Sequence, residues 1–192
     1  MLKLEDREWE VFNYEVVFPF ISRGKRLKKD DHVSGRKPYV SSTANNNGVD
    51  AFVGNEAGVR QYEYCLTVAN SGSVGTTFFH PYEFVASDHV TSLKNPKFNE
   101  HVYKFLIPLV QRLQEKYSFN REINDRRIRR EIILLPVDHK GDPDWEFMAA
   151  YMCEQEKLML EKVLPYFKDR LLNNMLSLGA LPDSLWGGGK AE

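Results

Sequence analysis

The chain has 192 residues, a length that suits one domain with an appendage or two very small domains. Of these residues 42% are hydrophobic and 12% aromatic, a composition that supports a packed core and argues against global disorder. Its formal net charge is −1, but residues 21–130 hold 18 Lys/Arg and 11 Asp/Glu, whereas the remainder holds 8 and 16. Because attraction between charges is local and screened beyond about 8–10 Å, this basic central block can bind a polyanion despite a nearly neutral total, unless its charges are scattered over several faces.

The first residues, MLKLEDREWE, are acidic where a signal peptide is basic and then apolar, and no long apolar stretch is present, so we expect a cytoplasmic protein without a membrane segment. Residues 9–21 mix apolar and polar positions as a short strand does, with Pro19 marking an edge or a bend. Residues 22–56 place glycine, proline and asparagine around short apolar pieces. This pattern predicts loops separated by brief strands, with Asn47-Gly48 a strong turn signal.

Residues 63–79 predict a strand, a Gly/Ser turn and a second strand, and the β-branched run at 84–93 predicts one further strand. The hydrophobic pattern then changes, because apolar residues between 102 and 113 recur at helical spacing. Pro108 is expected to kink or split this helix. A basic stretch follows and leads into an apolar strand that stops at Pro136.

The last part of the chain, from residue 145 to 178, has apolar residues along one face of a long helical tract, which Pro165 is expected to bend or divide. We therefore predict an α/β (α+β) fold with a β-rich globular domain at residues 1–140, a helical spacer or dimerisation segment at 141–180 and a flexible tail at 181–192. The sustained apolar face favours an intermolecular or interdomain contact such as a coiled coil.

Two cationic segments are candidates for binding phosphate groups. Each phosphate that a Lys or Arg neutralises releases a counterion, and Arg also reads guanine with two hydrogen bonds. The alternatives are a solvated charged turn for the first segment and ion pairs with Glu122, Asp125 and Glu131 for the second. The first segment comprises Arg23, Lys25, Arg26, Lys28 and Lys29, and the second comprises Arg121, Arg126, Arg127, Arg129 and Arg130.

Two polar segments are candidates for contacting bases. Asn can pair with adenine through two hydrogen bonds in the major groove, and Ser or Thr can serve bases or phosphates. The alternative for both segments is a simple turn, since Asn and Gly are turn formers. The first segment comprises Ser41, Ser42, Thr43, Asn45, Asn46 and Asn47, and the second is the Gly/Ser turn with its flank, including Asn70, Ser71, Ser73 and His80.

Enzyme signatures are weak in this sequence. The NPKF segment at 95–98 differs in its third residue from the NPP[YF] element of adenine methyltransferases, and no glycine-rich cofactor element precedes it. Pro143-Asp144 lacks a following Glu and Lys at the spacing of a PD…ExK nuclease. The five histidines show no paired-ligand spacing, and Cys65 and Cys153 lie far apart, so we expect no metal, no cofactor and no catalytic residue.

Four segments, taken in order, are DREWEVF with FISRGKRLKKDD, GRKPYVSSTANNNGV, CLTVANSGSVGTTFFHPYEFVASDHVTSL, and INDRRIRREIILLPVD with PDWEFMAAYM. In order and spacing they resemble the specificity subunit of type I restriction–modification systems, in the version attached to fused type II restriction–methylation enzymes, over roughly residues 8–165. The resemblance implies a target recognition domain followed by a helical spacer, with two spacers packed antiparallel.

The resemblance further implies sequence-specific binding of double-stranded DNA, with adenine methylation and cleavage done by methyltransferase and restriction subunits or domains. A full specificity subunit has two recognition domains and two spacers, so this chain fits a half-subunit that homodimerises through its C-terminal helix, or a domain of a fused enzyme. We expect the two cationic segments to hold the phosphate backbone and the two polar segments to lie near base edges. The main alternative is a protein–protein adaptor that docks through its long helix, and a small endonuclease or methyltransferase is the other.

Overall fold

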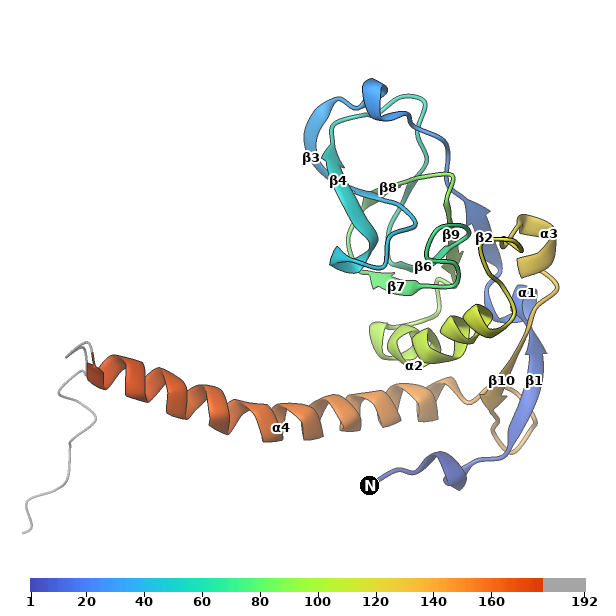
Figure 1. Cartoon of the computed structure of the whole chain (residues 1–192). Helices are drawn as coiled ribbons and strands as arrows, with labels where there is room; N and C mark the ends of the chain where they lie inside the picture. Colours follow the sequence, from blue (N-terminus) through green and yellow to red (C-terminus); the bar gives the residue numbers. More distant parts are fainter. Residues whose placement is uncertain (178–192) are drawn as a thin grey trace, which may run out of the picture. The chain divides into compact units, whose positions relative to one another are not determined.

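The computed structural model describes residues 1–177 of the chain (Figure 1). By its internal contacts the chain divides into two units, Met1–Met152 and a second that begins at Cys153. The long helix α4, Trp145–Ser177, contributes its first eight residues to the first unit, because Phe147 and Met148 are buried there. The boundary at 140/141 between recognition domain and spacer stays a prediction, and the expected tail at 181–192 lies outside the described residues.

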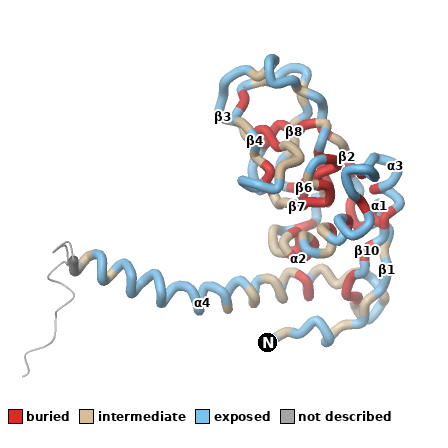
Figure 2. The backbone as a smooth tube through the Cα atoms, viewed as in Figure 1, coloured by how far each residue is buried: buried red, intermediate tan, exposed pale blue. Residues whose placement is uncertain are grey.

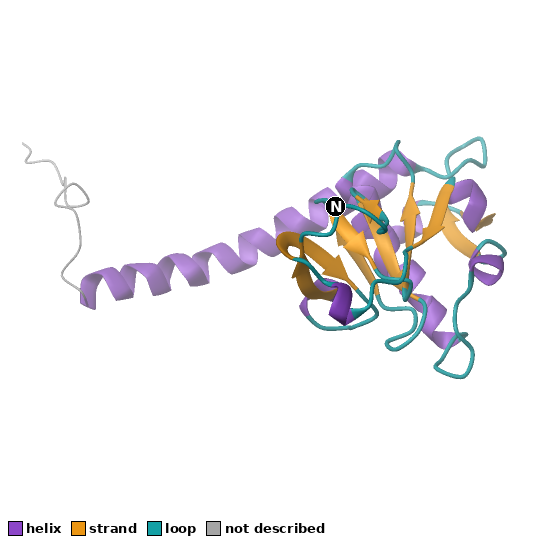
Figure 3. Cartoon of the chain, turned by 90° about the horizontal axis from the view of Figure 1, so that it is seen from above, coloured by secondary structure: helices purple, strands orange, loops and turns teal. Residues whose placement is uncertain are grey.

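The first unit is rich in strands, and Figure 3 shows them grouped together with loops at their ends. The strands in chain order are β1 (Trp9–Asn13), β2 (Phe20–Arg23), β3 (Ser34–Val40), β4 (Val49–Val53), β5 (Gln61–Tyr62), β6 (Cys65–Ala69), β7 (Thr77–His80), β8 (Phe84–Ala86), β9 (Val90–Lys94) and β10 (Ile132–Pro136). The helices that join them are α1 (Tyr14–Val17), α2 (Glu100–Gln111) and α3 (Asp125–Ile128), with single 3-10 turns η1 (Leu4–Asp6), η2 (Lys29–Asp31), η3 (Asn46–Gly48) and η4 (Arg112–Glu115).

The strands form three sheets. One has the order β2-β9-β6-β7 and is antiparallel throughout, the second has the order β4-β3-β8-β5 with β3 and β8 parallel, and the third pairs β1 with β10. Helix α2 packs on β6 and β7, and the strand β6 is buried along its whole length. Leu66, Leu93, Tyr103 and Leu106 lie in the main hydrophobic core, so the apolar face of α2 is what covers this sheet.

The expected α/β (α+β) fold with a long C-terminal helix is confirmed, but residues 84–93 are not one strand. Strand β8 pairs with β3, whereas β9 pairs with β2 and β6 in the other sheet. Between them the chain turns, since the amide of Ser87 donates to the carbonyl of Val40 and the amide of Val90 donates to the carbonyl of Ser87. The run of β-branched residues therefore crosses from one sheet to the other, which strand propensity alone does not reveal.

Neither proline divides its helix, which was one of the two outcomes expected at each. Helix α2 continues through Pro108 to Gln111, and α4 continues through Pro165 to Ser177. Both prolines are exposed. A proline ring on the solvent side leaves the buried face of α2 intact, because the packing of that face, rather than the one missing amide donor, decides whether the helix persists.

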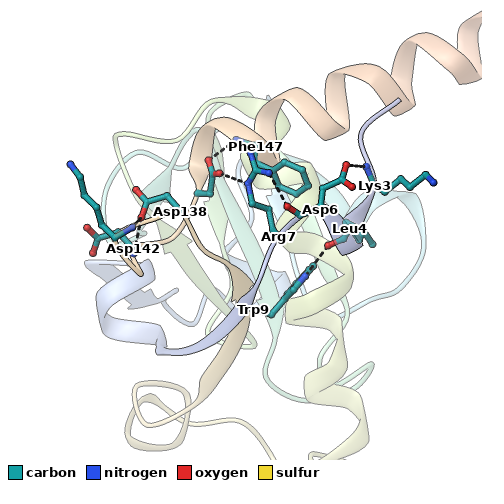
Figure 4. A network of polar contacts seen from close by, with 10 residues as sticks. Lys3, Leu4, Asp6, Arg7, Trp9, Asp138, Asp142 and Phe147 are labelled. Carbon is teal, nitrogen blue, oxygen red and sulfur yellow. Dashed lines mark hydrogen bonds and ion pairs between the residues drawn. The ribbon is translucent and has the colours of Figure 1, made fainter.

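The start of α4 is held by residues from the start of the chain (Figure 4). The carboxylate of Asp144 accepts a hydrogen bond from the amide of Phe147 at 2.8 Å, which caps the helix, and another from Nε of Arg7 at 2.8 Å. The guanidinium of Arg7 also lies 4.6 Å from the centre of the Phe147 ring. One arginine near the N-terminus thus stabilises both the cap and the first turn of the long helix.

The second unit, from Cys153 to the end of the described residues, is a single helical stretch in which most positions are exposed (Figure 2). Its exposed large apolar residues include Met159, Leu160, Val163, Leu164, Phe167 and Leu171. Several of these recur at intervals of four, which places them on adjacent turns of one side of the helix. Within the described residues, the helices are too short or too polar to cross a membrane.

Candidate nucleic-acid interface

Three loops meet at one end of the sheet β2-β9-β6-β7. The antiparallel register pairs Arg23 with Thr91 and Ala69 with Val90, so the end of β2, the end of β6 and the start of β9 coincide. The chain beyond these points forms the basic loop (residues 24–29), the Gly/Ser turn (residues 70–76) and the β8–β9 turn (residues 87–89). The sheet register therefore brings together two segments that are 40 or more residues apart in sequence and were expected to contact DNA.

Hydrogen bonds join these loops. The amide of Asn70 donates to the carbonyl of His89 at 2.8 Å, and the amide of Gly24 donates to the carbonyl of Val90 at 3.0 Å. The Nε atom of Arg23 donates to the carbonyl of Asp88. Arg23 is therefore partly occupied in holding the β8–β9 turn, and the cations that follow it in the chain carry the exposed charge.

The loop of residues 41–47 packs against the Gly/Ser turn. The amide of Ser73 donates to the carbonyl of Ser42 at 3.1 Å. Gly72 has a φ of +59°, and a Cβ atom at that position would lie 2.8 Å from the Oγ atom of Ser42. Glycine is needed at residue 72 both for its left-handed backbone and for the close approach of the two loops.

The arginine segment (residues 121–130) adjoins the same place. The amide of Ile123 donates to the carbonyl of Asn70 at 3.1 Å, and α3 contacts β2. The short helix α3 begins where the side chain of Asn124 accepts from the amide of Arg127 at 2.9 Å. The structure thus connects all four segments singled out in the sequence.

The predicted cations differ in what they contact. Arg127 donates to the carbonyl of Glu122 at 2.6 Å, and Arg129 donates to the carbonyl of Ile21 at 2.6 Å and pairs with Glu15. Within the described residues, none of the five arginines pairs with Glu122, Asp125 or Glu131 as the alternative required. Among these predicted cations, the exposed ones whose side chains have no hydrogen-bond or ion-pair partner in the described part of the chain are Lys25, Arg26, Lys28, Lys29, Arg126 and Arg130.

Arg121 faces a different part of the surface. It lies 5.5 Å from the centre of the Tyr117 ring and lines a cleft of about 840 Å³ between β10 and the end of α2. In the wall of this cleft the buried carboxylate of Glu131 accepts from Lys116 at 2.7 Å and from the hydroxyl of Tyr117. Burial, with a contribution from Glu131, raises the pKa of Tyr117 to about 12, so this phenol stays protonated and keeps donating.

The polar residues of the 41–47 loop lie at the surface. Ser41, Ser42 and Thr43 are half-buried, and Asn45, Asn46 and Asn47 are exposed. Asn46 and Asn47 have φ angles of 49° and 56° and form η3 with Gly48, so the turn reading of this segment is correct. Asn45 and Asn46 present their side-chain amides to solvent, whereas Nδ2 of Asn47 donates to the hydroxyl of Tyr82 at 3.3 Å.

The prediction that Asn70 and His80 lie near base edges is corrected by the structure. Asn70 and His80 are fully buried, and their side chains bond inside the protein. The Oδ1 atom of Asn70 accepts from the hydroxyl of Thr91 at 2.8 Å, and Nε2 of His80 lies 2.8 Å from the hydroxyl of Thr67. Burial lowers the pKa of His80 to about 4, so its ring is neutral at neutral pH. Both side chains hold the loops in place, and neither reaches the surface.

The other two serines of the Gly/Ser turn are closer to solvent, and they point to a residue that the sequence did not single out. Ser71 is buried, with 7% of its surface exposed, and Ser73 is half-buried. The hydroxyl of Ser71 lies 2.7 Å from Nδ1 of His89, whose side chain is 48% exposed. A lone histidine does not indicate a functional site in the sequence. His89 lies at this surface only because the β8–β9 turn contacts the Gly/Ser turn.

A cavity of about 290 Å³ opens beside these loops. Its lining combines the basic loop with residues of β3, β4 and the β8–β9 turn. Tyr39 is nearly buried there, and burial raises the pKa of its phenol. The lining residues are Arg26, Leu27, Lys28, Lys29, His32, Tyr39, Ser41, Asp50, Ala51, Ser87, Asp88 and His89.

The segments with weak enzyme resemblance have structural roles. The side-chain amide of Asn95 donates to the carbonyl of Val17 at 2.9 Å, and its Oδ1 accepts from the amide of Lys97 at 3.0 Å, so it organises the turn before α2. Asp144 caps α4 and pairs with Arg7. The contacts of these two side chains account for their positions without any catalytic function.

Fold and surface together define a class of protein: a β-rich domain with a loop-built cationic surface, continued by a long helix. The family described as the type I restriction modification DNA specificity domain matches residues 6–163, and the chain belongs to this family. The resemblance seen in the sequence is thereby confirmed.

Among curated relatives, the type II restriction enzyme specificity subunit S.BcgI of Heyndrickxia coagulans is 36% identical over 155 residues, which cover 80% of this chain and 45% of the relative. The chain thus spans less than half the length of that relative. Among solved structures, the HsdS subunit of Thermoanaerobacter tengcongensis aligns with a TM-score of 0.57 at 14% identity, covering 81% of this chain and 39% of that one. The type I S subunit of M. genitalium aligns with a TM-score of 0.57 at 13% identity, covering 94% and 47%. These two likenesses concern the fold.

Proposed function

We propose that this chain binds double-stranded DNA in a sequence-specific manner as the specificity component of a restriction–modification system. The observation that carries the proposal is the set of exposed cations without partners, which two distant segments supply to connected loops. Cations paired with carboxylates gain little from DNA, whereas unpaired ones bind phosphates with release of counterions. The match to a DNA specificity family supports the same function.

Within this function, different loops contact phosphates and bases. The basic loop and the exposed arginines Arg126 and Arg130 hold phosphates, and the half-exposed or exposed residues of the 41–47 loop, with Ser73, contact base edges. Asn70 and His80 are buried, so they support the loops from inside and do not contact DNA. The chain supplies recognition only, and methylation and cleavage belong to methyltransferase and restriction subunits or domains that it brings to DNA.

Within the same proposal, the second unit joins two copies of the chain into a dimer. A helix with exposed Val163, Phe167 and Leu171 at intervals of four is stabilised when a second helix covers those residues. Two copies of this chain joined through α4 would present two recognition surfaces, which matches the coverage of less than half of S.BcgI. The same exposed residues also favour the alternative of an adaptor that docks a different protein through α4.

The test is a titration of DNA binding against salt. Duplexes selected by the chain from a random pool serve as ligand, and affinity is measured between 50 and 200 mM salt for the wild type and for Lys28→Ala with Arg126→Ala. We expect the double variant to bind more weakly to every duplex and its slope of log affinity against log salt to fall by about 2, since each phosphate contact contributes about 0.9.

The matched control is Lys97→Ala. Strand β9 begins at the loops and ends at Lys94, so exposed Lys97 lies beyond the opposite end of the sheet and its loss should leave the slope unchanged. Selection of no preferred duplex by the wild type, with binding of a partner protein that is indifferent to DNA, would establish the adaptor instead. Methyl transfer or DNA cleavage by the isolated chain would overturn its non-catalytic assignment.

A further inference from the structure

The cavity beside the basic loop contains a carboxylate in an unusual setting. Asp50 lies in β4 and lines the cavity. The cations Arg26, Lys28 and Lys29 line it too. Asp50 is exposed, and within the described residues its side chain has no hydrogen-bond or ion-pair partner. The three cations likewise have none. A carboxylate therefore stands among free cations without pairing with any of them.

An irregularity in the strand pairing determines where Asp50 lies. Tyr39 pairs with Ala51 and Val40 pairs with Val49, so Asp50 is the extra residue of β4 between two consecutive pairs. Such a bulge changes the direction of a side chain, and bulges are frequent beside functional sites. A regular register would alternate residues 49, 50 and 51 between the two faces of the sheet, whereas here Asp50 and Ala51 both line the cavity.

The chemistry of DNA limits what this carboxylate can contact. A phosphate would be repelled by Asp50, so the group that suits it is a hydrogen-bond donor. The donors that DNA offers in the major groove are the exocyclic amino groups of cytosine and adenine. Adenine places its N7 acceptor beside its amino group, which suits an amide side chain, whereas a carboxylate suits the amino group of cytosine.

We propose that Asp50 is a specificity-determining residue, which accepts a hydrogen bond from the N4 amino group of a cytosine while Arg26, Lys28 and Lys29 bind the phosphates beside it. This inference rests on the proposed DNA-binding function. It assigns a base-reading role to an acidic residue, although the sequence pointed only to amides, hydroxyls and cations. The cations serve a second purpose here, because they offset the repulsion between Asp50 and the DNA backbone.

The experiment selects bound duplexes from a random pool with the wild type, with Asp50→Asn and with Asp30→Asn. Asp30 is an exposed carboxylate in η2, next to Lys29, and it does not line the cavity, so Asp30→Asn reproduces the change in charge alone. Affinities are then compared between the selected duplex and the duplex with a thymine·adenine pair at each selected cytosine position. Thermal unfolding of each variant checks that it is folded.

We expect one cytosine position at which the wild type and Asp30→Asn lose about tenfold in affinity on substitution, which is the size of one good base contact. At that position the affinity of Asp50→Asn should fall less than twofold when thymine replaces cytosine, because an amide can form a hydrogen bond with either base. A folded Asp50→Asn variant that keeps the tenfold preference at every cytosine would overturn the proposal. That result differs from failure of the proposed function, in which the wild type itself selects no duplex.

Discussion

The amide of Ser73 donates a hydrogen bond to the carbonyl of Ser42, at 3.1 Å, and this contact joins two loops that lie 31 residues apart in the sequence. Gly72 makes the contact possible, since a side chain at that position would meet Ser42 at 2.8 Å. The arrangement of the candidate interface thus depends on a pair of loops in van der Waals contact rather than on any one loop alone.

Gly72→Ala should destabilise the domain and weaken DNA binding. A left-handed φ costs a residue with a Cβ atom roughly 1–2 kcal/mol, and the clash with Ser42 adds to this cost because one of the atoms met is backbone. Urea unfolding measures the effect. Gly58→Ala is the matched control, because Gly58 has a φ of +76° and open space around its Cβ position. Equal losses of stability in the two variants would mean that the close approach to Ser42 does not contribute to the free energy of unfolding.

Asp144→Ala should lower the free energy of unfolding by about 1–2 kcal/mol, since it removes both the cap of α4 and the partner of Arg7. Asp144→Asn separates the two effects, because asparagine caps a helix as well as aspartate does but carries no charge. We expect Asp144→Asn to lose less than half as much, given that the side chain of Arg7 is about a third exposed and such pairs contribute little. Chemical denaturation with helix content followed by circular dichroism provides the measurement, and a loss in Asp144→Asn as large as in Asp144→Ala would show the ion pair to dominate.

The buried ring of His80 should make the domain sensitive to acid. Its pKa is lowered to about 4 by burial, whereas an unfolded histidine has a pKa near 6.5, so below pH 6.5 the unfolded state takes up a proton that the folded state does not. The contribution of the neutral ring to stability is therefore present above pH 6.5 and is lost as the pH falls toward 4, by up to about 3 kcal/mol. His80→Gln removes the titrating group, and its stability should change less than that of the wild type between pH 7 and pH 4.5 in urea titrations. Parallel curves for the two proteins would contradict this assignment.

Phe167→Glu should dissociate the proposed dimer. Phe167 is 57% exposed in the single chain, and covering it and its neighbours drives association of two α4 helices. We expect the dissociation constant from sedimentation equilibrium to rise at least tenfold. Lys162→Glu introduces the same side chain 140° away around an ideal helix, five residues earlier, and should leave the dissociation constant within a few fold. A wild-type chain that is monomeric at all concentrations, or a Phe167→Glu variant that dimerises as tightly, would exclude α4 as the dimer interface.

Much of the local structure was predictable, because it depends on residues close in sequence. The Gly/Ser turn between β6 and β7, the turn at Asn47-Gly48 and the helix after Asn95 are confirmed. The split of residues 84–93 between two sheets was not predictable, since both halves have the composition of a strand and only pairing with distant partners separates them. Pro108 does not divide its helix for a similar reason, because packing of the buried face of α2 outweighs one missing hydrogen bond.

The residue types of the candidate interface can be read from the chain alone: a basic loop, a dense arginine segment and turns rich in Asn, Ser and Gly, in an order that resembles one family. Which of these side chains reach solvent depends on how the folded strands and loops pack together. It buried Asn70 and His80, directed Arg121 to another cleft, and brought His89 and Asp50 to the surface beside the cations. Sheet register and the bulge at Asp50 determine the direction of these side chains, and neither is encoded in a local sequence pattern, because both depend on pairing with distant strands.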